Sequence, residues 1–142
     1  MTSKQRTEIL SSISIANVAD HHDWLRWCFQ EELKARLSEK PCDHFENIYH
    51  CALLLHVIGD LSDLPLMYRA KCSGDMDLGI GFDWQFLFFN QPSVLKNYAD
   101  SVERADIAKW IEDYQEDYKK EDMSLWLKMR IKYFDVPQVE KN

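Results

Sequence analysis

The stretch DHFENIYHCALLLHVIG, residues 43–59, carries the most regular hydrophobic pattern in this chain of 142 residues. Its apolar and aromatic side chains recur at spacings of three, four and seven residues, as they do on one face of an α-helix. The positions are Phe45, Ile48, Tyr49, Ala52, Leu55 and His56. We expect Asp43 to open this helix and Gly59 to end it, since these residue types satisfy the free backbone groups at helix ends. The stretch therefore predicts an amphipathic helix with this face in the core.

A second helix is predicted before this stretch. Its apolar positions recur every four residues and are Leu25, Phe29, Leu33 and Leu37. Asp20 or Asp23 is suited to cap its start, and Pro41 is expected to end the segment. Residues 1–19 are expected to form an N-terminal helix or arm.

The part of the chain after Gly59 also reads as helices joined by short links. Pro65 suits the first turn of a short helix that ends near Cys72, and residues 73–81 are expected to be irregular because they hold three of the four glycines. The aromatic run Phe82–Phe89 is expected to be a buried helix, although periodicity alone does not separate helix from strand in so short a run. Further helices are predicted over Pro92–Ser101, Glu103–Tyr118 and Met123–Phe134.

These elements predict a single all-α domain over residues 1–142, with about seven helices and a loose tail over residues 136–142. The order of helix, Gly-Asp and Pro-started helix over Asp43–Cys72 is similar to one hairpin of a HEAT repeat.

Charge and composition exclude several classes of protein. The chain has 17 basic and 24 acidic residues, a net charge of −7, which argues against a binder of nucleic acid or of anionic membranes. Residues 1–19 lack the apolar core of a secretory signal, and no apolar run is long enough to span a bilayer. A cytoplasmic protein is therefore expected. Its four cysteines lack CxxC spacing and are expected to be buried thiols; they are Cys28, Cys42, Cys51 and Cys72.

No complete catalytic motif is present, so we expect neither an enzyme nor a bound cofactor or metal. The spacing of the five histidines does not suit zinc, and Asp75–Gly79 lacks the glycine and glutamate of a calcium loop. Asp75 and Asp77 are expected to cap neighbouring helices, or to be contact residues of a protein interface. A hydrolase with an unrecognised site remains an alternative, because acid pairs assemble only in the folded chain.

The charge pattern of one predicted helix is more informative. Residues 100–122 contain nine acidic and four basic residues, a net charge of −5. Five acids are expected to point outward with little compensation, and they are Asp106, Glu112, Asp113, Glu116 and Asp117. They form either a solvated face that favours solubility or a docking surface for a basic protein. Trp110 lies beside the core face and is a candidate for a partly exposed anchor.

Several segments of the sequence resemble a group of small, acidic, helical bacterial proteins that have a HEAT-like hairpin. The resemblance is carried by Gly59–Lys71 (GDLSDLPLMYRAK), by Asp77–Leu87 (DLGIGFDWQFL), and by Trp126 and Tyr133-Phe134. Some members of that group are immunity proteins of polymorphic or contact-dependent growth inhibition toxin systems.

The resemblance implies an immunity protein that binds a cognate toxin domain and blocks its active site. The acidic helix adds a basic nuclease as the expected partner, because the cleft of such an enzyme attracts phosphates. A HEAT-like scaffold or adaptor without a toxin partner is the alternative from another functional class. The resemblance assigns no contact residues, since such surfaces differ with each toxin.

Overall fold

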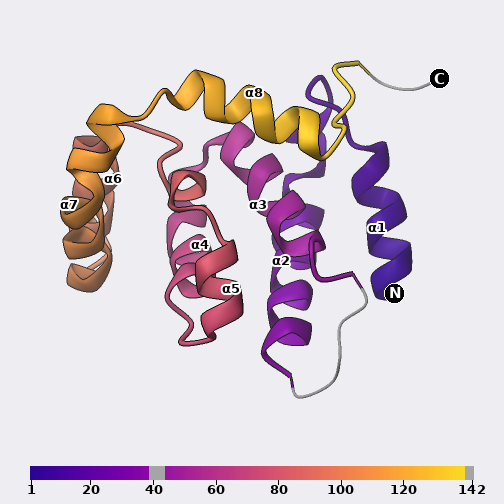
Figure 1. Cartoon of the computed structure of the whole chain (residues 1–142). Helices are drawn as coiled ribbons and strands as arrows, with labels where there is room; N and C mark the ends of the chain where they lie inside the picture. Colours follow the sequence, from indigo (N-terminus) through magenta and orange to yellow (C-terminus); the bar gives the residue numbers. More distant parts are fainter. Residues whose placement is uncertain (39–43, 140–142) are drawn as a thin grey trace. The chain divides into compact units, whose positions relative to one another are not determined.

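The computed structural model describes residues 1–38 and 44–139 of the chain (Figure 1). These residues form eight α-helices and three 3-10 helices and contain no β-strand, so the predicted all-α class is confirmed. The α-helices are α1 (Ser3–Ser12), α2 (His22–Leu37), α3 (Asn47–Ile58), α4 (Leu64–Lys71), α5 (Met76–Gly81), α6 (Pro92–Ser101), α7 (Ala105–Lys120) and α8 (Met123–Tyr133). The 3-10 helices are η1 (Val18–His21), η2 (Leu61–Asp63) and η3 (Trp84–Leu87).

The chain divides into two compact units. Unit 1 is Met1–Ile58 with Met129–Asn142, and unit 2 is Gly59–Lys128. The single domain over residues 1–142 stays a prediction, and so does the HEAT-like hairpin, because α3 and α4 belong to different units.

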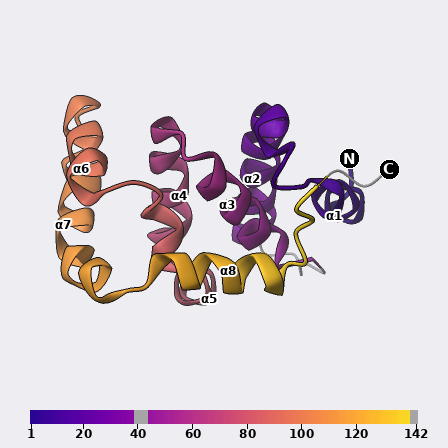
Figure 2. The ribbon, with the colours of Figure 1, turned by 90° about the horizontal axis from the view of Figure 1, so that it is seen from above.

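Unit 1 is built on the antiparallel pair α2 and α3, with α1 packed on α3 (Figures 1 and 2). Helix α1 begins with a capping box, in which the Thr2 hydroxyl accepts from the Gln5 N–H at 3.1 Å and the Gln5 side chain accepts from the Thr2 N–H at 2.7 Å. At α2 the predicted cap is wrong, since His21 stands at the cap position and neither Asp20 nor Asp23 caps the helix. Leu37 is also exposed, because it lies in the last turn of α2.

Helix α3 is buried over more of its circumference than the predicted amphipathic face. Ile48, Ala52 and Leu55 lie in the core as predicted, but Leu53 and Leu54 are equally buried. The other predicted core positions differ: Phe45 precedes the helix and is 53% exposed, and Tyr49 and His56 are only half-buried. Gly59 ends the helix with φ +73°, the conformation that favours glycine there. The predictions for Pro41, Cys42 and Asp43 lie outside the described residues.

The C-terminal segment is held more firmly than predicted. Val136 is buried, and the carbonyl of Pro137 accepts a hydrogen bond from the N–H of Ile15 at 2.8 Å. The expectation of a loose tail from residue 136 is therefore wrong at its start, while residues 140–142 lie outside the described part.

Unit 2 contains α4 to α7 and the first turns of α8, and α6 and α7 form an antiparallel hairpin in it (Figure 2). Helices α4, α6 and α8 match their predicted ranges, with Pro65 in the first turn of α4. Helix α7 begins at Ala105 because Glu103 has φ +59°, which a helix does not accommodate.

Two predictions in unit 2 are corrected. The segment 73–81, predicted to be irregular, contains α5, which Asp75 caps. The aromatic run 82–89 is buried as predicted at Phe82, Phe86 and Phe88, but it forms only the single turn η3 with irregular flanks instead of a full helix. Each aromatic side chain buries a large area, so these residues fill the core of unit 2 even though their backbone is mostly not helical.

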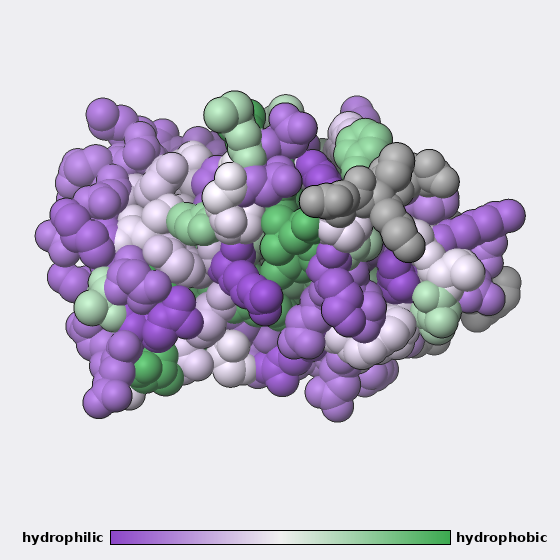
Figure 3. All heavy atoms as spheres, turned by 90° about the horizontal axis from the view of Figure 1, so that it is seen from below, coloured by the Kyte–Doolittle hydropathy of each residue, from purple (hydrophilic) through white to green (hydrophobic). Residues whose placement is uncertain are grey.

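The surface of the molecule is mostly polar on the face drawn in Figure 3, with apolar side chains in separate small groups. Within residues 1–38 and 44–139, no helix combines the length and apolar character that crossing a bilayer requires.

Candidate functional site

Helix α7 presents its acidic residues to solvent as predicted. All five predicted acids are exposed, while Ile107 and Ile111 are fully buried on the opposite side of the helix. The acids nevertheless fall into two groups. Asp106, Asp113 and Asp117 share one face with Trp110, because the four stand at spacings of i, i+4, i+7 and i+11. Glu112 and Glu116 lie on another face of the helix.

Four of the five acids are paired with bases. The prediction that nearby bases compensate little of their negative charge is therefore wrong. Arg104 binds Asp106 through two nitrogens at 3.1 and 3.0 Å, and Lys109 lies 2.9 Å from Asp113. Lys119 lies 2.9 Å from Glu116, and Lys96 of α6 lies 3.5 Å from Glu112. Lys96 was missed because it comes from the neighbouring helix of the hairpin.

The pairs affect the ionisation of the face only locally. The hydrogen bond from Arg104 lowers the pKa of Asp106, and the hydrogen bond to Asp113 raises the pKa of Lys109. Both shifts favour the charged forms, so these groups stay ionised at neutral pH. Among the described residues Asp117 has no ion-pair partner, which leaves its carboxylate available on the face of Trp110.

A cluster of aromatic rings lies beside these acids, and we call it the α7 aromatic cluster. It consists of Tyr68, Trp84, Phe88, Trp110, Tyr114 and Tyr118. Trp110 stacks on Tyr114 with ring centroids 4.5 Å apart, and Phe88 stacks on Tyr118 at 5.2 Å. Phe88 is buried and contacts the rings of Trp84, Trp110 and Tyr118. The other five rings of the cluster are half-buried. Trp110 is thus partly exposed, as predicted, and its ring is held in place on several sides.

One ring of the cluster also makes a cation–π contact with an arginine side chain. The guanidinium carbon of Arg104 lies 5.8 Å from the ring centroid of Tyr68, while the same group binds Asp106. The sequence did not reveal this arrangement, because Tyr68 and Trp84 come from α4 and η3 and join α7 only in the folded unit.

Asp75 and Asp77, the other predicted contact residues, do not join this surface. The carboxylate of Asp75 accepts a hydrogen bond from the Leu78 N–H at 2.8 Å and caps α5, which confirms the predicted capping role. Asp77 is exposed in the first turn of the same helix. Figures 1 and 2 both show α5 apart from the α6–α7 hairpin.

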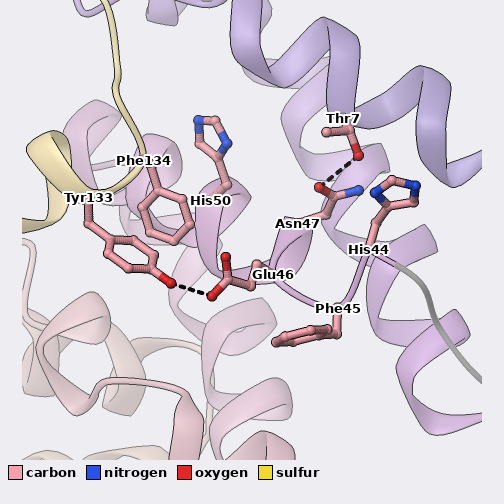
Figure 4. Close-up of a pocket in the computed structure, with 8 residues that line it drawn as sticks. All are labelled: Thr7, His44, Phe45, Glu46, Asn47, His50, Tyr133 and Phe134. Atoms are coloured by element: carbon pink, nitrogen blue, oxygen red, sulfur yellow. Dashed lines mark hydrogen bonds between the residues drawn. The ribbon is translucent and has the colours of Figure 1, made fainter.

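A pocket of about 550 Å³ in unit 1 was not predicted. Figure 4 shows Tyr133 and Phe134 on one side and Thr7, Asn47 and His44 on the other, with Glu46 and His50 between them. Phe45 completes the lining. No local pattern indicates this pocket, because Glu46 and Tyr133 are separated by 87 positions.

The polar groups of this pocket are largely engaged with one another. The Tyr133 hydroxyl donates a hydrogen bond to the carboxylate of Glu46, which raises the pKa of Tyr133. The side-chain carbonyl oxygen of Asn47 accepts a hydrogen bond from the Thr7 hydroxyl at 3.0 Å, and the side-chain amide of Asn47 donates one to Glu32 at 3.1 Å. These contacts hold the end of α8 and helix α1 to the start of α3.

His50 is the exception in the pocket. The residue is 8% exposed, and its ring stacks on that of Phe134 with the centroids 5.0 Å apart. Its Nε2 has no hydrogen-bond partner among the described residues. Burial lowers the pKa of His50 to about 4, so the imidazole is neutral at neutral pH. No group of three or more histidine, cysteine or acidic side chains within residues 1–38 and 44–139 is placed to hold a metal ion.

Comparison with known protein families, with curated proteins and with solved structures found no match to this chain.

Proposed function

We propose that this protein is an immunity protein that binds a basic bacterial toxin domain, a nuclease, and blocks its active site in the cytoplasm. The contact surface in this proposal is the face of α7 formed by Asp106, Trp110, Asp113 and Asp117, together with the α7 aromatic cluster. The observation that carries the proposal is the half-exposed, stacked Trp110–Tyr114 pair beside exposed carboxylates.

Aromatic side chains of this kind favour protein binding. Trp and Tyr are enriched at the energetic centres of interfaces because they bury large areas at little entropic cost. Here the rings are already fixed by contacts within unit 2, so ordering them on binding costs little further entropy.

The charges beside the rings favour a basic partner. Water screens exposed ion pairs such as Lys109–Asp113, so a partner's arginine or lysine replaces the internal base at small cost. Asp117 offers a carboxylate that is paired with no base in the part of the chain that the structure describes. The excess of acids over residues 100–122 also speeds the encounter with a cationic cleft.

Affinity for the basic toxin domain encoded beside the gene tests this proposal. We expect Trp110→Ala to weaken binding by about 2 kcal/mol or more, as truncation of a central aromatic anchor does. Trp27→Ala is the matched control, because Trp27 of α2 is 40% exposed and lies outside the proposed surface. Circular dichroism checks that both variants keep their helices.

The possible outcomes test the immunity function and the proposed contact surface separately. If no such toxin domain exists, or if it does not bind the wild-type chain, the immunity function is wrong and a scaffold or adaptor is favoured. If it binds and Trp110→Ala matches the wild type, the function stands and the proposed contact surface is wrong.

A further inference from the structure

The two buried cysteines of unit 1 form a pair across its central helices. Cys28 lies in the middle of α2 and Cys51 in α3, and both are fully buried. The Cys51 thiol donates to the sulfur of Cys28 at 3.2 Å. The prediction of buried thiols is confirmed for these two residues, whereas Cys72 is exposed.

From this geometry we propose that Cys28 and Cys51 are a disulfide-forming pair that joins α2 to α3. A disulfide needs about 2.05 Å between its sulfurs, so the two atoms have to approach by only about 1 Å. The helices that carry them are already packed against each other. Cys72 is exposed, so it does not share the buried surroundings of this pair.

The surroundings of the pair accept a disulfide more readily than a thiolate. Burial raises the pKa of Cys51, and the nearby carboxylate of Glu32 adds to this effect. The Cys51 thiol in the folded chain is therefore protonated and slow to react. A disulfide is uncharged and apolar, so it fits this core without the cost of burying a charge.

The bond forms while the helices assemble or open, when a low-molecular-weight disulfide such as oxidised glutathione reaches the sulfurs. One cysteine thiolate attacks the glutathione disulfide, forms a mixed disulfide and releases one glutathione thiolate. The second cysteine then loses its proton and attacks the protein sulfur of that intermediate, which releases the second glutathione. The two protein thiols are oxidised by two electrons, and one glutathione disulfide is reduced to two thiols.

Refolding in a glutathione mixture tests the pair, since exchange then selects the cysteines that the fold brings together. The unfolded, reduced full-length chain is refolded with oxidised glutathione in excess, the free thiols are blocked at acidic pH, and the disulfide is located by peptide mass spectrometry. We expect one bond, between Cys28 and Cys51, in a monomeric chain about 2 Da lighter than the reduced one. We also expect a higher denaturant midpoint, which a reductant reverses.

Two variants and the contrary results complete the test. Cys72→Ser is the matched control and should keep both the bond and the gain in stability, whereas Cys28→Ala should lose both. If Cys28→Ala fails to fold, the bond map of the wild-type chain decides the question by itself. Bonds to Cys42 or Cys72 as the main product, or a refolded chain with four free thiols, would overturn the proposal.

Discussion

Glu32 is a charged side chain placed almost entirely inside unit 1. It is 2% exposed, and one of its oxygens accepts from Arg6 Nε at 2.7 Å and from the amide of Asn47 at 3.1 Å. The same oxygen is within reach of the Ser3 hydroxyl at 3.5 Å. The buried Arg6–Glu32 pair and Asn47 thus link α1, α2 and the start of α3. The sequence indicates this pair only weakly, because charged residues are usually exposed.

Removing one partner of this buried pair should be costly. We expect Glu32→Ala to lower the free energy of unfolding by about 3–5 kcal/mol, since the guanidinium of Arg6 is then buried without its counter-charge. Glu8→Ala in α1 is the control, and its effect should stay within about 0.5 kcal/mol because Glu8 is exposed. Urea unfolding measures both, and a loss below about 1 kcal/mol for Glu32→Ala would show that Arg6 finds water or another partner.

His50 should make the stability of the protein depend on pH. Its pKa falls from 6.5 to about 4 on folding, so the unfolded chain binds the proton more readily between these values. The contribution of His50 is complete above pH 6.5, falls as the pH drops, and levels off below pH 4. The full loss amounts to about 3 kcal/mol at most, from about 1.4 kcal/mol per pKa unit.

The variant His50→Phe isolates this effect, because it keeps a ring against Phe134 but does not titrate. We expect its free energy of unfolding to fall less steeply than that of the wild type between pH 6.5 and 4. Parallel curves for the two proteins in urea titrations would mean that folding does not lower the pKa of His50.

At the scale of elements, α3 shows what periodicity reveals and what it hides. The pattern located the helix and its end at Gly59 correctly, and it identified Ile48, Ala52 and Leu55 as core positions. It failed at Phe45, because the helix starts two residues later and the turn before it carries this ring to the surface. Three consecutive leucines at 53–55 indicate that the buried surface of this helix extends beyond one face.

A pair of substitutions in this region tests the difference. Leu55→Ala should lower the free energy of unfolding by about 2–5 kcal/mol through lost burial and the cavity that remains. Phe45→Ala should cost about 1 kcal/mol or less, since it removes only an exposed ring and its contact with Arg36. If thermal or urea unfolding shows equal losses of stability for the two variants, Phe45 is buried in the core after all.

Other elements show why local signals succeed or fail. Asp75 was recognised as a cap because an aspartate followed by free N–H groups has a local function, and Pro65 and Pro92 marked helix starts for the same kind of reason. The caps of α2 and the turn at Glu103 were missed, because neither depends on a residue type with a strong local preference.

At the scale of the whole molecule, the sequence was sufficient for the all-α class and for most helix ranges, because hydrophobic periodicity is a local property. It predicted the exposed acids of α7 and the partial exposure of Trp110. It could not predict the aromatic cluster around Trp110, the pairing of Glu112 with Lys96, or the pocket beside His50. Each of these depends on residues from separate elements, so only the folded units reveal them.

The proposed function depends most directly on the face of α7 that carries Trp110, and charge reversal tests that face against a matched control on the same helix. Asp113→Lys with Asp117→Lys changes this face, whereas Glu112→Lys with Glu116→Lys makes the same change in net charge on another face. All four positions are exposed, so each substitution should alter the free energy of unfolding by only about 0.5 kcal/mol.

The decisive measurement is the association rate with the basic toxin domain at about 0.05 and 0.5 M salt, for the wild type and both double variants. The proposal predicts that Asp113→Lys with Asp117→Lys slows association by about tenfold or more at low salt and flattens its dependence on salt. Glu112→Lys with Glu116→Lys should slow it much less. Equal rates and equal salt dependence for all three proteins would contradict the proposed docking surface and assign the acids of α7 to solubility.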